Sequence, residues 1–300
     1  MNIRFLETFW WLAKLRNFGA VAARLNTTQP AISSRLRALE RELGVTLLRR
    51  TPRGAQLTPA GLGVLRHVET ILEEARRIRE RIGGDDEPAG IVRLGVVDAI
   101  VRTWLPDLFA WIGERHPRIA LEVTVDTTLA LGRGLREGEL HCVVAIEPVR
   151  EEHLASAPLC RYALGLVCRP DRAPPRKGRR PVEPEELARL PLIAYPPQSP
   201  PARLLADYFE RAGVAWSASS VSNSMSTMIE LAADGIGVAL VPPVCVARDV
   251  AAGRLVEIPA ARPFAPIPFF ASWRAAPRDA AIAAVVDGAR EVASGYKGSL

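Results

Sequence analysis

The sequence lacks the motifs on which several classes of chemistry depend. Its four histidines show no H-E-x-x-H spacing, and no G-x-G-x-x-G, G-x-x-x-x-G-K-[ST] or G-x-S-x-G stretch occurs. The cysteines have neither metal-ligand nor C-x-x-C spacing, so we predict no metal site and no cofactor. All four, Cys142, Cys160, Cys168 and Cys245, are predicted to be buried thiols, with a redox-sensing pair as the alternative.

Long apolar runs are also missing. No run of about 18 apolar residues occurs, which is the length that a membrane-spanning helix needs. The apolar segment 5–13 is interrupted by Glu7 and followed by Lys14, and it has no small-residue cleavage site. We therefore predict a cytoplasmic protein that does not contact a membrane.

Acidic residues are scarce in the first fifth of the chain. Residues 1–60 hold ten Lys and Arg against three Asp and Glu, a net charge of +7 in a chain of +6. Because the remaining residues are nearly neutral in sum, the basic character belongs to one small segment, as in a domain that binds a polyanion. A solvated basic surface is the alternative. With 300 residues, 48% of them hydrophobic, the chain is long enough for two or three globular domains.

The basic segment predicts three helices. Asn2 and Thr28 are N-cap residues, and apolar side chains recur at helical spacing after each of them. Small residues at 19–23 indicate a short helix between these two. The last helix has Pro30 in its first turn, ends at Gly44 and should bury Ile32, Leu36, Leu39 and Leu43. A helix, a tight turn and a helix with a polar outer face are typical of recognition in the major groove of DNA.

Polar side chains should point outward at the start of this third helix. Gln29 can bind an adenine edge with two hydrogen bonds, and Pro30 can contact a thymine methyl group. Ser33 and Arg37 can hold phosphates. The alternative is an ordinary capped surface helix.

A hairpin-like segment follows at 47–58. Two short apolar arms flank a turn at Pro52 and Gly54, and Arg50 and Arg53 should project from it toward the sugar-phosphate backbone.

Residues 5–61 resemble the DNA-binding domain of the LysR-type transcription regulators along their whole length. The shared motifs are T-Q-P-A-I-S, R-A-L-E, L-G-V-x-L-L-x-R and L-T-x-A-G. The resemblance implies a winged helix-turn-helix at 1–58 that binds promoter DNA. The implied contacts with DNA are Thr28, Gln29, Pro30, Ser33, Ser34, Arg37, Arg50 and Arg53. Many members have Arg where this chain has Ser34, so we expect a different base preference at that step.

A long helix is predicted to start near Thr58 and to end near Ile82. Its apolar residues form a heptad seam, Val64, Val68, Ile71, Ala75, Ile78 and Ile82. Such a seam predicts dimerisation, which the family resemblance favours, whereas packing on the chain's own C-terminal domain is the alternative. Residues 59–90 are thus interpreted as a dimerisation helix followed by a Gly-rich hinge.

Short apolar strands alternate with helices through the rest of the chain. The predicted strands are 91–97, 120–125, 142–146, 163–168, 192–195, 218–221, 237–241 and 267–273. This alternation predicts an α/β fold with open, mostly parallel sheets. Ligands of such sheets lie beyond the carboxyl ends of the strands, beside helix N-termini.

The order of several segments resembles the effector domain of the same family. These segments are VRLGVVDAIVRTWLP, LREGELHCVVA, LPLIAYP, MIELAADGIGVALVPPVCV and GRLVEIP. The resemblance implies a periplasmic-binding-protein-like domain at 91–300 with two Rossmann-like lobes. Lobe one would comprise about 91–161 and 267–300, and lobe two about 162–266.

A small-molecule effector is implied between these lobes. By resemblance its cleft is lined by Asp98, Ala99, Thr127, Thr128, Ser199, Asn223 and Ser224. Helix N-termini favour anions, which makes a small organic carboxylate the first expectation. Asp98 would repel such a ligand. It either caps its own helix and pairs with Arg102, or it binds a cationic group of the ligand.

Three functions are compatible with the C-terminal pattern. An enzyme would need motifs that the chain lacks, and a periplasmic solute-binding protein would need a secretion signal and no DNA-binding segment. We therefore expect a LysR-type regulator and not an enzyme. A homodimer or homotetramer would bind an interrupted palindrome, and the effector would alter DNA bending and the access of RNA polymerase.

Overall fold

The computed structural model describes residues 1–51, 54–82, 88–174, 180–275 and 279–296. The chain divides into two compact units, Met1–Asp86 and Glu87–Leu300. No helix in the described ranges combines the length and the hydropathy needed to cross a bilayer. Arg53 and most of the predicted hinge lie outside the described residues, as do the side chains of Arg50, Ile78 and Ile82.

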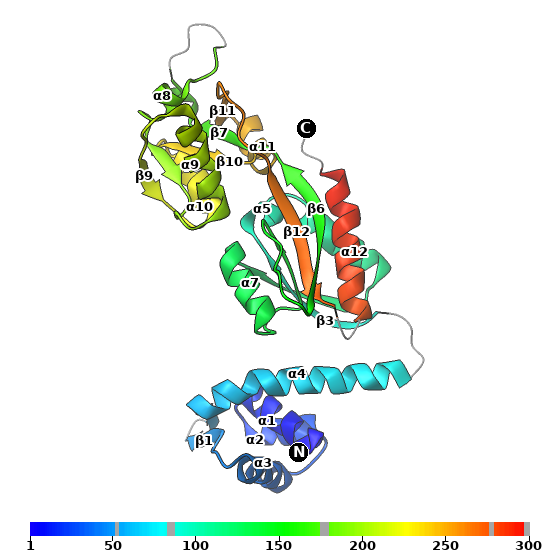
Figure 1. The fold of residues 1–300 in the computed structure, drawn as a ribbon. Coiled ribbons are helices and arrows are strands. Elements are labelled where there is room, and N and C mark those ends of the chain that lie inside the picture. The colour runs from blue at the N-terminus through cyan, green and yellow to red at the C-terminus, as the bar shows by residue number, and fades with distance from the viewer. Residues whose placement is uncertain (52–53, 83–87, 175–179, 276–278, 297–300) are drawn as a thin grey trace. The chain divides into compact units, whose positions relative to one another are not determined.

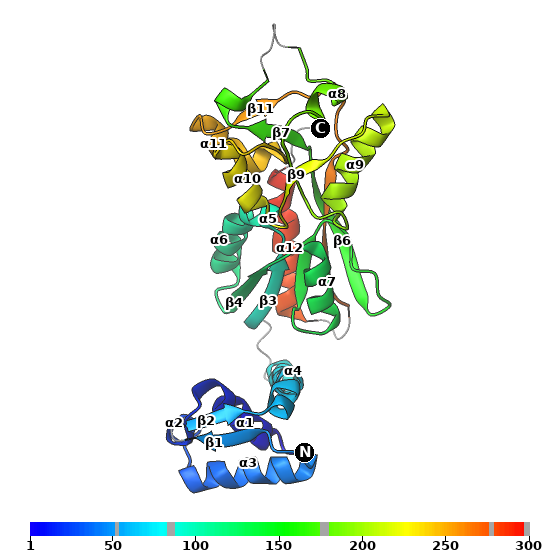
Figure 2. The same ribbon diagram turned by 90° about the vertical axis from the view of Figure 1, so that its left-hand side faces the viewer.

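The N-terminal unit is a helical domain with a two-stranded wing (Figure 1). Its elements are α1 (Ile3–Leu15), α2 (Phe18–Arg24), α3 (Gln29–Leu43), β1 (Leu48–Thr51), β2 (Gly54–Leu57) and α4 (Pro59–Ile82). Strands β1 and β2 pair antiparallel. Helices α3 and α4 lie on opposite sides of this unit (Figures 1 and 2).

Polar caps set the helix boundaries in this unit. The Oδ1 atoms of Asn2 and Asn17 accept from the backbone N–H groups of Arg4 and Ala20, at 2.9 and 3.0 Å. The predicted cap at Thr28 is confirmed, and Gly44 ends α3 with a φ of 71°, which favours glycine.

The core of the N-terminal unit joins α1, α2 and α3. Its buried members include Leu6, Phe9, Leu12, Val21, Ile32, Leu36 and Leu39. Leu43, predicted to be buried, is 36% exposed because it lies in the last turn of α3, beyond the helices that cover the rest of the stripe.

Helix α4 packs on this core with part of its predicted seam. Val68 is 1% exposed and belongs to the core, and Val64 and Ile71 pack against it. The indole Nε1 of Trp10 in α1 also donates to the Glu69 carboxylate at 3.1 Å. The prediction that Val68 forms a dimer seam is therefore wrong, because α1 of the same chain covers it.

The C-terminal unit contains two lobes, each built on a five-stranded sheet. Lobe one has the sheet order β4-β3-β5-β12-β6. Its elements are β3 (Gly90–Val96), α5 (Asp98–Val101), α6 (Leu105–Arg115), β4 (Ile119–Val125), α7 (Thr128–Arg136), β5 (Cys142–Ala145), β6 (Leu154–Tyr162), β12 (Ile267–Arg274) and α12 (Ala280–Gly295).

Lobe two has the sheet order β11-β7-β10-β8-β9. Its elements are β7 (Gly165–Cys168), the 3-10 helix η1 (Pro170–Arg172), α8 (Pro184–Leu187), β8 (Leu192–Ala194), α9 (Pro200–Ala212), β9 (Ala218–Val221), α10 (Met225–Ala233), β10 (Val238–Val241), α11 (Pro243–Ala251) and β11 (Val256–Ile258).

The prediction of mostly parallel sheets is wrong. In lobe one β3 is parallel to β4 and β5, but β12 returns from the end of the chain and lies antiparallel between β5 and β6. In lobe two β7 is antiparallel to β10 and β11, whereas β8 is parallel to β9 and β10. Strands β6 and β11 were not predicted. Each lobe still has three adjacent parallel strands, and their carboxyl ends determine where side chains gather.

Candidate DNA-binding face and effector cavity

The start of α3 presents an open polar face. Thr28, Gln29 and Pro30 are exposed, and so are Ser34 and Arg37 farther along the helix. The Thr28 Oγ1 atom accepts from the Ala31 N–H at 3.4 Å, and α3 has no acidic residue in its first turn. A helix N-terminus carries a partial positive charge, and with no acidic side chain beside it this one is suited to bind phosphate oxygens.

Two predicted DNA contacts differ from this exposed set. Ser33 is only 8% exposed, because it flanks the buried stripe of Ile32 and Leu36, so its predicted outward position is wrong. The Arg37 Nε atom donates to the Ser33 carbonyl oxygen at 3.2 Å, which lays the side chain along the helix. The backbone of Arg50 lies in the wing opposite Ala55.

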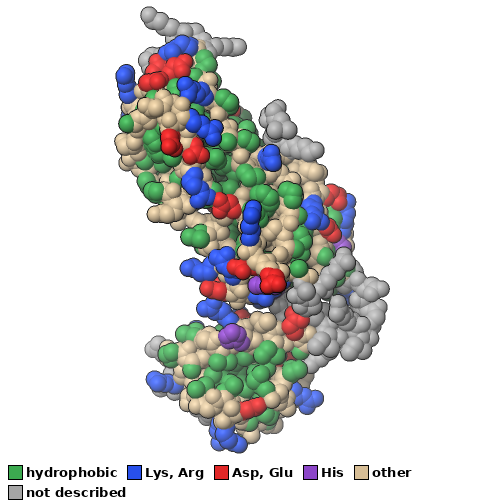
Figure 3. All heavy atoms as spheres, viewed as in Figure 1, with side chains coloured by type: hydrophobic (Ala, Val, Ile, Leu, Met, Phe, Trp, Pro, Cys, Tyr) green, Lys and Arg blue, Asp and Glu red, His purple; other side chains and the backbone are tan. Residues whose placement is uncertain are grey.

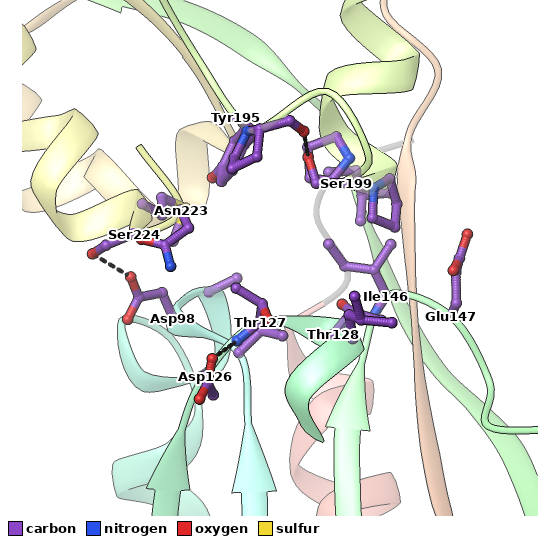
Figure 4. A pocket seen from close by; sticks show the side chains of 18 of the residues that line it. Asp98, Asp126, Thr127, Thr128, Ile146, Glu147, Tyr195, Ser199, Asn223 and Ser224 are labelled. Carbon is purple, nitrogen blue, oxygen red and sulfur yellow. Dashed lines mark hydrogen bonds between the residues drawn. The ribbon is translucent and has the colours of Figure 1, made fainter. Parts of the chain in front are cut away.

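A cavity of about 590 Å³ lies between the lobes of the C-terminal unit (Figure 4). Its wall includes all seven residues predicted to contact an effector: Asp98, Ala99, Thr127, Thr128, Ser199, Asn223 and Ser224. The volume falls within the range of about 300–1,000 Å³ that is usual for small-molecule sites. That these residues bind an effector stays a prediction.

Three carboxylates reach the cavity from lobe one. Val96 of β3 is opposite both Val125 of β4 and Val144 of β5, so these parallel strands end at one edge of the sheet. Asp98, Asp126 and Glu147 follow the three strand ends and line the cavity. Asp126 and Glu147 were missed in the sequence because each is one acidic residue after a short strand.

Asp98 binds the other lobe. Its Oδ2 atom accepts from the Ser224 hydroxyl at 3.0 Å and from the Ser226 N–H at 3.2 Å, at the start of α10 (Figure 4). The N-cap residue of its own helix α5 is Val97. The prediction that Asp98 caps its own helix is therefore wrong, because the unsatisfied N–H groups of the longer α10 lie within reach.

Arg102 also differs from its predicted pairing with Asp98. Its Nη2 atom lies 2.7 Å from Oδ2 of Asp249, and its Nε atom donates to the Cys245 carbonyl oxygen at 2.9 Å. Asp249 is buried, and its other oxygen is 2.7 Å from Nη1 of Arg254. Arg102 thus links α5 of lobe one to α11 of lobe two.

Three helices begin at the cavity with their caps in place. The hydroxyl oxygens of Thr127, Ser199 and Ser224 accept from the backbone N–H groups of Ala130, Ala202 and Thr227, at 3.3, 3.4 and 3.3 Å. This confirms that several of the predicted effector residues lie at helix N-termini.

Tyr195 is a cavity residue that the sequence did not single out. It follows β8 and faces Asp98 and Asp126 from the opposite wall (Figure 4). Burial raises the pKa of Tyr195, and so do the Cys245 thiol and the Asp98 carboxylate. The hydroxyl is therefore protonated at neutral pH.

The four cysteine thiols do not ionise readily. Cys142, Cys168 and Cys245 are buried as predicted, whereas Cys160 is half-buried. Burial raises the pKa of Cys142 and Cys245 to about 12 and that of Cys168 to about 11, and it also raises the pKa of Cys160.

Family models match both units. The model described as "Bacterial regulatory helix-turn-helix protein, lysR family" matches residues 3–62, and that of the "LysR substrate binding domain" matches residues 85–294. The chain belongs to the LysR family of transcription regulators. It is accordingly a DNA-binding regulator whose activity is modulated by an effector.

Relatives of this LysR-type regulator include proteins with different names. A probable hydrogen peroxide-inducible genes activator of Mycobacterium avium is 32% identical over 253 residues, which cover 83% of this chain and 80% of the relative. The HTH-type transcriptional regulator BbuR of Bordetella bronchiseptica is 31% identical over 255 residues, 84% of this chain and 77% of that protein.

Solved structures agree with the fold of the LysR-type regulator. A full-length OxyR variant from Pseudomonas aeruginosa superposes with a TM-score of 0.69 at 26% identity, covering 97% of this chain and 95% of that one. CbnR complexed with its target DNA gives a TM-score of 0.66 at 23% identity, covering 97% and 100%, and this likeness concerns the fold alone.

Proposed function

We propose that the regulator binds promoter DNA with the exposed start of α3 in the major groove. The observation that carries this proposal is the exposure of Thr28, Gln29 and Pro30 at a helix N-terminus. No acidic residue lies in the first turn of this helix, and the unit around it is basic. Gln29 contacts a base, and Ser34 and Arg37 contact the bases or phosphates beside it. Arg50 and Arg53, which the sequence predicts to contact the flanking sugar-phosphate backbone, complete the proposed contacts; their side chains lie outside the described residues.

Titration of DNA from upstream of the chain's own gene tests this assignment. Gln29→Ala should weaken binding of the specific site by about 1 to 3 kcal/mol and leave binding of random DNA nearly unchanged. Arg37→Ala should weaken both and reduce the dependence on salt. If Gln29→Ala lost the same affinity for specific and for random DNA, the placement of α3 in the major groove would be wrong.

The protein acts as a homodimer or homotetramer in this proposal. Hydrophobic side chains gather on one face of the N-terminal unit in Figure 3, and the exposed hydrophobic residues of this unit include Ile3, Leu15 and Leu62. The seam of α4 beyond Val68 continues at Ala75, which is not part of the unit's own core. RNA polymerase is the further partner that such an oligomer would affect on the promoter.

Light scattering of the full chain tests the seam. Ala75→Glu would place like charges across a two-fold interface and should shift the protein toward monomers. Thr70→Glu, on an exposed part of α4, is the matched control and should leave the oligomer intact. An unchanged mass for Ala75→Glu would locate the interface elsewhere.

A response to peroxide through a reactive thiol is the second candidate. Relatives named as hydrogen peroxide-inducible genes activators suggest it. The raised pKa of all four cysteines opposes it, since the thiolate is the reactive form. We expect slow reaction with a disulfide reagent at neutral pH, faster as the pH rises. Rapid reaction of one thiol near pH 7 would favour the peroxide response.

The cavity binds its effector without converting it in this proposal, and the protein acts in the cytoplasm. Family membership supports both statements, because the matched domains are those of transcription regulators and a regulator acts where promoter DNA is. Closure of the lobes on the effector would change how the paired DNA-binding units are placed. The small organic carboxylate predicted from sequence is one candidate for this effector.

A further inference from the structure

The cavity is lined by more carboxylates than cations. Asp98, Asp126 and Glu147 reach it from lobe one, and Arg203 of α9 is the cation that the described residues place in its wall. Arg203 is paired with Glu147, and both side chains are about half exposed at the rim. The remaining charge therefore comes from Asp98 and Asp126.

Neither of these two carboxylates is paired with a cation among the residues that the structure describes. Asp98 accepts from a hydroxyl and a backbone N–H, both on Oδ2. Asp126 accepts from the Thr127 N–H at 2.6 Å on Oδ1. Each carboxylate has lone pairs left for a donor, and a carboxylate offers about four acceptor positions in all.

The same two groups fill the positions where an anionic ligand would bind. Asp98 accepts from the Ser226 N–H at the start of α10, and Asp126 accepts from the Thr127 N–H that precedes α7. These are the helix N-termini from which an anion would draw its hydrogen bonds. A ligand carboxylate at either place would have to approach a carboxylate of the chain, which is repulsive.

The opposite wall suits a cation on an apolar body. The Tyr195 hydroxyl and the Asn223 amide have no hydrogen-bond partner within the described part of the chain, and both residues line the cavity. The Tyr195 ring offers a π face to an ammonium group. Met225 contributes apolar surface on this side, and Ile146 and Phe269 contribute it from lobe one.

We infer that the cavity binds an organic amine, with its ammonium group held between Asp98, Asp126 and Tyr195 and its apolar part against the hydrophobic wall. This inference rests on the proposed role of the cavity as the effector site. It replaces the carboxylate with a ligand of the opposite charge.

Calorimetry on the full chain tests the charge of the ligand with three probes of similar shape. These are 2-phenylethylamine, 2-phenylethanol and phenylacetate, which are cationic, neutral and anionic at neutral pH. We expect the amine to bind about tenfold or more tightly than phenylacetate, with the alcohol between them. Equal affinities, tighter binding of phenylacetate, or no binding of the amine at millimolar concentration would overturn the inference.

Substitutions of single carboxylates test which of them bind the ammonium group. Asp126→Asn keeps an acceptor for the Thr127 N–H at an exposed position and should weaken binding of the amine about tenfold without changing that of the alcohol. Glu122→Gln, exposed on β4 outside the cavity wall, is the control and should change neither. An amine affinity equal to wild type in both Asp126→Asn and Asp98→Asn would also overturn the inference.

Titration of upstream DNA without any probe separates this inference from the proposed function. A chain that binds its DNA specifically but prefers phenylacetate keeps the DNA-binding function and loses only the amine. If the chain prefers the amine but shows no specific DNA binding, the inference about the ligand stands and the role proposed for α3 is wrong.

Discussion

Helices α3 and α10 begin in the same way but have opposite electrostatic surroundings. In each, a hydroxyl caps the N-terminus: Thr28 accepts from Ala31 N–H at 3.4 Å, and Ser224 from Thr227 N–H at 3.3 Å. No acidic residue lies in the first turn of either helix. At α10, however, Asp98 of the other lobe binds the free donors, whereas the start of α3 is exposed in a basic unit.

This contrast shows that a local cap does not decide what a helix N-terminus binds. The partial positive charge is similar at the N-termini of α3 and α10, and it attracts an anion at each. At α3 the anion must come from outside the chain, which suits a DNA phosphate. At α10 it is supplied by Asp98, which leaves the cavity with a negative charge to be matched by its ligand.

Placing a carboxylate at the start of α3 should have the largest effect. Gln29→Asp imitates the arrangement at α10, so the helix would repel phosphates as well as lose a base contact. We expect affinity for specific and random DNA to fall by roughly a hundredfold, or about 3 kcal/mol. Fluorescence anisotropy with both DNAs at several salt concentrations measures the loss.

Gln29→Asn is the matched control for that charge. It keeps an amide and should affect the specific DNA more than the random DNA. If Gln29→Asp and Gln29→Asn had the same affinity for random DNA, the start of α3 would not lie near the phosphates. Its proposed difference from the start of α10 would then be wrong.

Removing the carboxylate from the start of α10 should have an intermediate effect. Asp98→Ala leaves the Ser226 N–H and the Ser224 hydroxyl without their acceptor, a loss of about 1 to 3 kcal/mol. Hydrogen exchange at the Ser226 amide of the full chain should accelerate about tenfold or more, while α3 is unaffected. Asp98→Asn keeps an acceptor oxygen and should accelerate it less. Unchanged exchange in Asp98→Ala would mean that Asp98 does not hold α10.

The sequence predicted local features well because they depend on neighbouring residues. The cap at Thr28, the stop at Gly44 and the strand at Cys142–Ala145 all follow from residue types a few positions apart. The seven predicted effector residues gather at one cavity because strand ends and helix starts converge in this fold.

Contacts between distant segments were not predictable in the same way. Asp98 and Ser224 are separated by more than a hundred residues, and a helix cap from another lobe leaves no mark in local spacing. The spacing of Val68 is compatible both with a dimer seam and with the core of its own unit. Which of the two it joins depends on the position of α1. The order of β12 between β5 and β6 likewise depends on the whole chain.

Removing the two hydroxyl caps should have the smallest effect and tests the contrast through coupling. Thr28→Ala and Ser224→Ala should each destabilise their own unit by about 1 kcal/mol, as is usual for N-caps. Because the Ser224 hydroxyl also donates to Asp98, Ser224→Ala and Asp98→Ala remove a shared contact and their losses should not add. Thr28→Ala and Asp98→Ala share none and should add. Hydrogen exchange in mild denaturant, resolved by unit, measures the loss of stability in the three single variants and the two double variants. Additive losses for Asp98→Ala and Ser224→Ala would show that the hydrogen bond between the two residues does not stabilise the start of α10, and the contrast with α3 would not hold.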